Sequence, residues 1–295
     1  MKNVFSAYSL QKLRVNNREI NCRTGGAGPP LLLLHGHPQT HYMWHKVADE
    51  LAENFTVVAV DLRGYGDSEK VPASDDHSTY SKREMAADQV ALMHKLGFNH
   101  FAILAHDRGA RVAHRLAVDH PQVVSKMIFL DIAPTLCMYE NTDETFARAY
   151  WHWFFLIRPA PLPESLIEFS PNQYIKSVMG ARSAGMRPFA EHALQEYQRC
   201  LSLKGTATAI CEDYRASTTI DLTHDRADLL ANNKITCPLL VLWGNNSIIS
   251  TCFEPKAEWE KVATTVEGFG LDCGHYIAEE LPDELLQHSL DFLIS

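Results

Sequence analysis

The sequence predicts an α/β protein with a mostly parallel, doubly wound sheet and an inserted helical lobe. Apolar runs at residues 31–34, 101–105, 126–130 and 238–243 have the length and continuous hydrophobicity of strands buried on both faces. Helical patterns alternate with most of these runs, which favours parallel pairing. Residues 134–220 instead contain aromatic residues, prolines and helical patterns without a convincing strand. We therefore divide the chain into a first core part at 1–133, a helical lobe at 134–220 and a second core part at 221–295.

The elements of the core follow in a regular order. Alternating residues on both sides of Asn16-Asn17 predict a hairpin over residues 12–23. After strand 31–34 come a helical segment around 44–51, a strand at 56–60 and an amphipathic helix at 82–96. Strand 101–105 leads into a helix that ends at Asp119, and strand 126–130 follows. Beyond the lobe, strand 238–243 precedes the loop at 270–275 and a final helix from Pro282.

Composition restricts the class of partner. The chain has 27 Lys and Arg against 36 Asp and Glu, a net charge of -9, and no basic run, which argues against nucleic acid and anionic membranes. We see no signal peptide and no segment long enough to span a membrane. The seven cysteines have no repeated spacing and indicate free thiols in a cytoplasmic protein. The 15 histidines are scattered, so we expect neither a metal nor another cofactor.

The turn between strand 101–105 and the next helix carries the candidate nucleophile. After Ala105 come His106, Asp107, Arg108 and Gly109, and a helical pattern begins. A nucleophile framed by small residues two positions away on each side is the elbow pattern of α/β-hydrolases, with Asp107 where serine more often sits. The small residues suit a sharp, strained turn. Asp107 as a simple helix cap is the alternative that this pattern alone leaves open.

Other strand ends supply the candidate base and acid. The carboxyl ends of parallel strands meet at one edge of a sheet, which brings the loop at His37, Asp107, Asp131 and His275 together. The order nucleophile, acid, histidine is that of α/β-hydrolases. Residues 244–247, where many hydrolases place the acid, hold no carboxylate, so we assign the acid to Asp131. We interpret Asp272 as a turn residue.

An aspartate nucleophile restricts the reaction. Attack on an ester would give an anhydride, whereas attack on an sp³ carbon bearing a leaving group gives an ester that water can cleave. This favours carbon–halogen bonds or epoxides as substrates. The backbone N–H groups of His37 and Arg108 are the candidate oxyanion hole. Arg108 and Arg111, one helical turn apart, predict contacts to a substrate carboxylate and a lowered pKa for Asp107.

These features resemble the fluoroacetate/haloacetate dehalogenases of the α/β-hydrolase superfamily over nearly the whole chain. The similar stretches are residues 35–40 (HGHPQT), 61–68 (DLRGYGDS), the elbow, 131–135 (DIAPT), 150–153 (YWHW), 159–164 (PAPLPE) and 212–216 (EDYRA). The first two are shared with epoxide hydrolases. The resemblance implies that His152, Trp153 and Tyr214 bind the departing halide, a role that suits their N–H and O–H donors.

Two departures from the family bear on the pocket. His37 stands where relatives commonly carry phenylalanine, which predicts a polar ring in the site. The lobe also lacks the tryptophan that relatives tend to carry near its middle, where Met179, Gly180 and Ala181 fall. We expect a roomier pocket for the acid as a result.

We predict a cofactor-independent 2-haloacid dehalogenase whose partner is a small-molecule haloacid, with a homodimer as the assembly to consider. Asp107 displaces halide to form an ester, and His275, supported by Asp131, activates the water that hydrolyses it. The first alternative is an epoxide hydrolase with the same Asp–His–Asp set and Tyr150, Tyr174 and Tyr214 as available acids. The second is a ligand receptor that has lost turnover, against which the intact nucleophile, base and acid argue.

Overall fold

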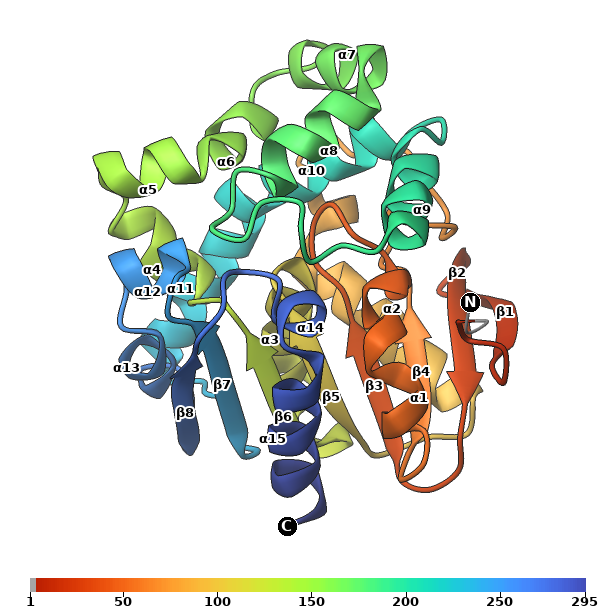
Figure 1. Ribbon diagram of the computed structural model, residues 1–295. Helices are drawn as coiled ribbons and strands as arrows, with labels where there is room; N and C mark the ends of the chain where they lie inside the picture. Colours follow the sequence, from red (N-terminus) through yellow and green to blue (C-terminus); the bar gives the residue numbers. More distant parts are fainter. Residues whose placement is uncertain (1–3) are drawn as a thin grey trace.

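The computed structural model describes residues 4–295, and it confirms the α/β fold with one eight-stranded sheet between layers of helices (Figure 1). The strand order is β1-β2-β4-β3-β5-β6-β7-β8. Strand β2 pairs antiparallel with both β1 and β4, and all later neighbours pair in parallel. The strands are β1 (Ser9–Val15), β2 (Arg18–Gly25), β3 (Pro30–Leu34), β4 (Thr56–Val60), β5 (Phe101–His106), β6 (Val124–Leu130), β7 (Leu239–Gly244) and β8 (Val266–Leu271).

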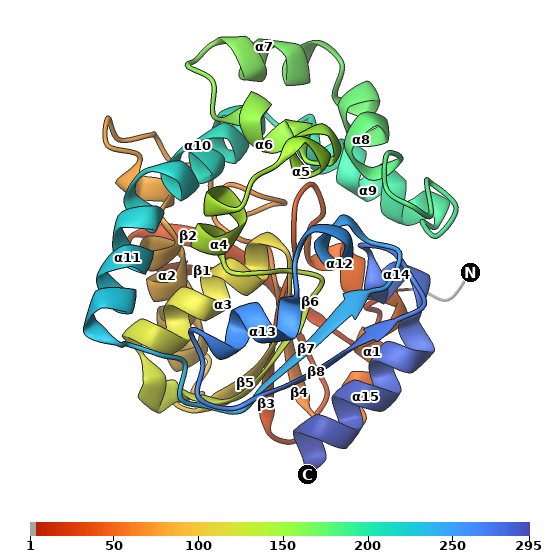
Figure 2. The same cartoon turned by 90° about the vertical axis from the view of Figure 1, so that its left-hand side faces the viewer.

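Helices cover both faces of the sheet. Helices α1 and α15 lie on one face and α2 and α3 on the other (Figure 2). The helices of the first core part are η1 (His41–Lys46), α1 (Ala48–Leu51), η2 (Ser78–Tyr80), α2 (Lys82–Lys95), α3 (Arg108–Asp119) and η3 (Pro121–Val123). Those that follow the lobe are α11 (Ile220–Ala231), α12 (Ile248–Cys252), α13 (Pro255–Glu260), α14 (Ile277–Glu280) and α15 (Pro282–Ile294).

The helical lobe lies over one end of the strands of the sheet (Figures 1 and 2). Between β6 and β7 the described chain contains helices and no named strand, as the sequence predicted. The helices of the lobe are α4 (Thr135–Glu140), α5 (Glu144–Ala149), α6 (Trp151–Leu156), α7 (Leu162–Phe169), α8 (Pro171–Met179), α9 (Glu191–Leu201) and α10 (Thr206–Thr218). The domain limits at residues 134 and 220 stay a prediction.

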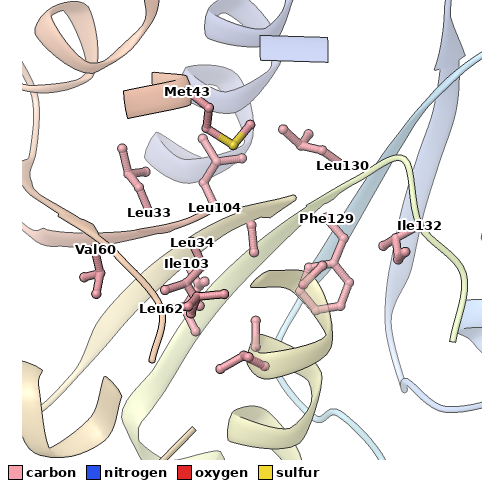
Figure 3. Packing of buried hydrophobic residues seen from close by; sticks show 14 of the residues in the cluster. Leu33, Leu34, Met43, Val60, Leu62, Ile103, Leu104, Phe129, Leu130 and Ile132 are labelled. Atoms are coloured by element: carbon pink, nitrogen blue, oxygen red, sulfur yellow. The ribbon is translucent and has the colours of Figure 1, made fainter. Parts of the chain in front are cut away.

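The core forms where the central strands meet the flanking helices. Leu33 and Leu104, from two neighbouring strands, are fully buried, and Met43 of η1 packs near them, while the buried Phe129 of β6 points to the opposite face of the sheet (Figure 3). Burying each such side chain contributes about 1.5–3 kcal/mol. Every residue of β5 is buried, which explains why an uninterrupted apolar run marked this strand. The strand thereby fixes the position of the residue that follows it.

Two elements differ from the sequence prediction. The segment expected as one helix around residues 44–51 is a 3₁₀ helix followed by the four-residue α1, because the backbone leaves the helical region at Val47. Strand β8 was not predicted. It lies at the edge of the sheet, where its residues alternate between exposed and half-buried, and Gly268 and Gly270 weaken the apolar pattern.

Two other observations concern the chain as a whole. No helix within residues 4–295 combines the length and the apolar character needed to cross a membrane. All seven cysteines lie in the described part of the chain, and none forms a disulfide. The free thiols agree with the sequence prediction, while the cytoplasmic location remains an expectation.

Candidate active site

Asp107 occupies a strained turn between β5 and α3. Its φ and ψ are 44° and -113°, outside the regions that side chains normally favour. A Cβ at Gly36 would lie 2.6 Å from the Cβ of Asp107, and one at Gly109 would lie 2.5 Å from the Leu34 carbonyl oxygen. Because the side chain of Asp107 makes no capping hydrogen bond to α3, the helix-cap alternative does not explain it. The carboxylate of Asp107 is therefore not used to cap α3.

His275 and Asp131, the residues predicted as base and acid, contact each other. The Nδ1 atom of His275 lies 2.7 Å from Oδ2 of Asp131, and both side chains are buried. Oδ1 of Asp131 accepts a hydrogen bond from the Gly244 N–H at 2.9 Å. Since both oxygens of the acid are engaged, the imidazole has a fixed orientation. Asp272, by contrast, binds the exposed Asn246 side chain, in line with its interpretation as a turn residue.

His106 packs against His275 and contacts its backbone, a role that sequence reasoning missed. Its Nε2 atom lies 3.0 Å from the His275 carbonyl oxygen, and the ring centroids are 4.6 Å apart. Burial, with a smaller contribution from His275, lowers the pKa of His106 to about 3. A neutral ring at this position packs against the base without adding a charge. The only sequence signal was its place beside the nucleophile.

The backbone at His37 faces the nucleophile. The His37 N–H donates a hydrogen bond of 3.1 Å to Oδ2 of Asp107. Arg108 is the first residue of α3, where a backbone N–H has no partner within the helix. Burial alone would raise the pKa of Asp107, but His275, His106, Arg108 and Arg111 lower it well below its ordinary value. These charges favour the ionised carboxylate, the form that the predicted nucleophile requires.

The side chain of Arg108 is largely committed to an acidic partner. Its Nε donates to Asp213 Oδ2 at 2.8 Å, and its Nη2 donates to the Asp213 carbonyl oxygen at 2.8 Å and to Ser217 Oγ at 2.6 Å. Lys82 also pairs with Asp213 and, at 3.4 Å, with Asp221. One buried donor of Arg108, Nη1, finds no partner among residues 4–295. Sequence reasoning missed Asp213, although the stretch 212–216 contained it.

Arg111 has no acidic partner of this kind. Its Nη1 donates to Thr135 Oγ1 at 2.5 Å, and its Nη2 lies 3.0 Å from Met138 Sδ. Its Nε is buried and unpartnered among residues 4–295, and its Cζ lies 4.7 Å from the centre of the Trp153 ring. Burial and the neighbouring Arg108 lower the pKa of Arg111. Arg111 is therefore a buried cation without a carboxylate partner among residues 4–295, an arrangement that an anionic ligand would stabilise.

The three residues proposed for the halide come together in the lobe. The Tyr214 ring lies 6.0 Å from the His152 ring and 6.3 Å from the Trp153 ring, measured between centroids. All three are buried, and within the described residues Trp153 Nε1 and Tyr214 OH have no hydrogen-bond partner. Burial lowers the pKa of His152 well below its ordinary value. The group therefore presents donors that carry no charge.

The side chain of His37 lies beside the same group of residues. Its Nε2 atom lies 2.9 Å from Tyr174 OH, and its ring stacks near His152 with centroids 6.1 Å apart. Burial lowers the pKa of His37 to about 3, so the ring is neutral. Whether the pocket is roomier than in relatives stays a prediction.

Only one group of residues in the described chain approaches metal-binding geometry. It consists of the half-buried Asp67 and Glu196 and the buried Cys200. The guanidinium of Arg199 already forms ion pairs with both carboxylates, at 2.6 and 2.7 Å. Ordinary ion pairs therefore account for this group.

Comparisons with known proteins place the chain among hydrolases. Residues 29–251 match the family described as alpha/beta hydrolase fold. A fluoroacetate dehalogenase of Burkholderia sp is 40% identical over 98% of this chain and 95% of its own length. A soluble epoxide hydrolase of Corynebacterium sp. (strain C12) is 33% identical over 94% of each chain. A solved structure of a proposed alpha/beta hydrolase from Nostoc sp PCC 7120 is 50% identical, with a TM-score of 0.96 over 98% of this chain and 99% of the other.

Proposed function

The chain belongs to the alpha/beta hydrolase fold family, in the branch that includes a fluoroacetate dehalogenase, and from this premise we propose that it hydrolyses haloacetates. The substrates would be fluoroacetate, chloroacetate and related short 2-haloacids, and the products the 2-hydroxy acid and halide. The chain is a hydrolase by its family, and the choice of substrate is the step that we propose.

One observation carries this proposal: a buried arginine without an acidic partner lies next to the nucleophile. Arg111 Nε and Arg108 Nη1 are buried donors that find no partner among residues 4–295. An α-haloacid brings its carboxylate close to Asp107, and two like charges about 4 Å apart repel by about 4 kcal/mol at the effective dielectric near a protein surface. The two arginine donors offset this repulsion and orient the carboxylate.

In the first step, an oxygen of Asp107 attacks the carbon that bears the halogen. The carbon–halogen bond breaks, the halide leaves with the bonding pair, and an ester links Asp107 to the substrate carbon. The halide departs toward His152, Trp153 and Tyr214, whose uncharged donors stabilise it. Fluoride has the highest charge density among the halides and requires this solvation most.

In the second step, water cleaves the ester. His275 accepts a proton from the water, and Asp131 stabilises the imidazolium through the 2.7 Å contact. The oxyanion that forms on the Asp107 carbonyl carbon accepts hydrogen bonds from the backbone N–H groups of His37 and Arg108. Collapse of this intermediate breaks the bond between the Asp107 carbonyl carbon and the alkoxy oxygen. The imidazolium of His275 returns its proton to that oxygen, which releases the 2-hydroxy acid, and Asp107 ends as a carboxylate after loss of the remaining proton.

Epoxide hydrolysis is the second candidate, and one observation favours it. The hydroxyls of Tyr150 and Tyr214 are buried without a partner among residues 4–295, and a phenol can protonate the alkoxide of an opening epoxide. The similarity to the Corynebacterium epoxide hydrolase points the same way. An epoxide has no charge, however, and gives no partner to Arg111.

A substrate screen tests the proposal. Fluoride and chloride release would be measured with fluoroacetate, chloroacetate and 1-chlorobutane, and diol formation with styrene oxide, for the wild type and Asp107→Ala. We expect halide only from the two acids and none with the variant. Diol formation without halide release would establish the epoxide hydrolase instead, and no reaction with any compound would favour a receptor.

An isotope experiment tests the ester. In a single turnover in heavy-oxygen water with excess enzyme, the label enters Asp107, because water attacks the carbonyl carbon of the enzyme. Mass spectrometry of the peptide that contains Asp107 reads the result. Label in the hydroxyl group of the glycolate instead would mean direct displacement by water.

A further inference from the structure

A third arginine reaches the candidate active site from the lobe. Arg182 lies in the irregular segment between α8 and α9, and sequence analysis assigned it no role. Its Cζ lies 4.2 Å from the centre of the Tyr150 ring. That ring stands between His152 and His275, with centroid distances of 5.3 and 6.3 Å. Arg182 therefore approaches the site between the proposed halide group and the base.

The contacts of Arg182 do not explain why a cation is placed there. Its Nη1 makes one long hydrogen bond, 3.4 Å, to the Ala149 carbonyl oxygen, and its Nε is buried without a partner in the described residues. Among residues 4–295 it forms no ion pair with a carboxylate. Burial alone would lower the pKa of Arg182, but Tyr150, Tyr276 and Asp107 raise it above its ordinary value. Asp107 is thus one of the groups that favour the charged form of Arg182.

A count of charges shows what is missing without Arg182. Arg108 is paired with Asp213, and Lys82 is shared between Asp213 and Asp221, so these two cations and two acids balance. Asp131 is hydrogen-bonded to His275 and is counted with that residue, apart from the substrate. At the proposed position of the substrate, Asp107 and a bound carboxylate bring two further negative charges. Arg111 balances one of them. A second cation is required, because unbalanced charge in a buried site costs several kcal/mol.

We propose that Arg182 is this second cation and that it determines the preference of the pocket for anionic substrates. This inference rests on the proposed function. When Asp107 becomes an ester, its negative charge passes to the departing halide, so two anions still face Arg111 and Arg182. A neutral substrate leaves one of the two cations without a partner.

The proposal also assigns a meaning to the segment that lacks the tryptophan of relatives. Residues 179–181 carry no aromatic side chain, and the next residue is Arg182. The lobe therefore contributes charge at this place instead of an aromatic ring. It follows that recognition of the acid is divided between α3 of the core and the segment at 180–190.

Arg182→Gln, Arg182→Lys and the control Arg187→Gln test the inference. Arg187 lies in the same segment but is exposed, with a single 3.4 Å hydrogen bond to Ala184. The measurements are kcat and KM for chloroacetate and the inhibition constants of acetate and acetamide, with the melting temperature as a check on folding. Acetate carries the charge and acetamide has nearly the same shape without it.

We expect Arg182→Gln to weaken acetate inhibition and chloroacetate kcat/KM by at least about tenfold, with acetamide unaffected. Arg182→Lys recovers most of the loss because it keeps the charge, and Arg187→Gln behaves as the wild type. An equal loss for acetate and acetamide, or a lysine variant no better than glutamine, would overturn the inference. If Arg182→Gln does not fold, a folded Arg182→Lys that loses discrimination between acetate and acetamide overturns it equally.

The same experiment distinguishes a failure of the proposed function from a failure of the role of Arg182. A wild type that releases no chloride from chloroacetate contradicts the proposed function. A wild type that does release chloride, together with an Arg182→Gln variant of unchanged kcat/KM, contradicts only the role of Arg182.

Discussion

The two sides of the candidate site differ in how their polar groups are bonded. On the sheet side, the carboxylates of Asp107 and Asp131 and the ring of His275 each have hydrogen-bond partners from the protein. On the other side, several buried donors lack partners within the described residues. These are Arg108 Nη1, Arg111 Nε, Trp153 Nε1, Arg182 Nε and Tyr214 OH.

This difference matches the proposed division between groups that react and groups that bind the substrate. A buried polar atom without a partner costs about 1–3 kcal/mol, so an ordinary interior contains few of them. Unpartnered buried atoms occur elsewhere among residues 4–295 as well, for example in Trp44 and Gln89. The five named here surround the proposed position of the substrate, where a ligand can supply the partners. The reacting groups need fixed geometry before the substrate arrives, and their existing hydrogen bonds provide it.

The largest expected effect comes from the sheet side. His275→Gln removes the base but leaves Asp107 able to displace halide, so steady-state turnover falls about 10⁴-fold. Rapid-quench measurement should give one equivalent of halide per active site and an adduct on Asp107 by mass spectrometry. Sustained turnover in this variant would remove His275 from the mechanism.

Asp213 comes from the lobe, but like the residues of the sheet side it is hydrogen-bonded within the protein. A substitution there tests whether it holds Arg108 in place. Asp213→Asn breaks a buried ion pair with Arg108 and should lower the free energy of unfolding by about 3–5 kcal/mol, measured in urea. The matched control is Asp221→Asn, which also faces Lys82 but does not touch Arg108. Equal losses in the two variants would mean that Asp213 does not hold Arg108.

Substitution of Arg111 tests the buried donors that lack partners among residues 4–295. Arg111→Ala should lower kcat/KM for chloroacetate by about 30-fold to several thousand-fold, the equivalent of 2–5 kcal/mol for a buried charged contact. Arg111→Lys keeps the charge but loses the planar fork, so its loss is smaller. Arg115→Lys serves as control, because Arg115 pairs with Asp119, Asp225 and Asp228. A control that loses as much specificity for chloroacetate would contradict the carboxylate contact.

The smallest effect concerns a buried acid between core and lobe that takes no part in the reaction. Glu279 accepts a 2.7 Å hydrogen bond from Tyr197 and lies 3.4 Å from Lys46 and 3.7 Å from His45. Burial raises the pKa of Glu279 to about 7, against an ordinary value of 4.5. The folded state therefore binds a proton that the unfolded state has released.

The sign follows from linkage. Stability is fully present below about pH 4.5 and is lost as the pH rises through about 7, by at most ~3 kcal/mol. Urea unfolding at pH 5 and pH 8 should show the wild type losing stability relative to Glu279→Gln. Glu260→Gln, at an exposed ion pair with Lys256, should keep the slope of the wild type. A pH slope that is unchanged in Glu279→Gln would contradict the raised pKa.

Much of the sheet and of the reacting group is predictable from local patterns. Strand β4 was predicted to the residue, and β3 and β5 differ by one residue, because strands buried on both faces must be apolar throughout. The rule that parallel strands end at one edge, together with the residue order of α/β-hydrolases, then predicted that Asp107, Asp131 and His275 lie together. Strand β8 escaped because an edge strand need not be apolar.

The sequence by itself determined the fold class, the nucleophile turn and the order of the reacting residues, since each depends on strand periodicity and turn chemistry close in the chain. Only the tertiary structure decided how the cations are partnered. Asp213 lies 105 residues from Arg108, and its ion pair leaves Arg111 and Arg182 as the cations of the candidate site that form no ion pair with an acid among residues 4–295. No spacing rule predicts that pairing, because it depends on how the lobe packs on the core. Charge balance in the pocket is a property of the packed fold, whereas the nucleophile turn is a property of the chain.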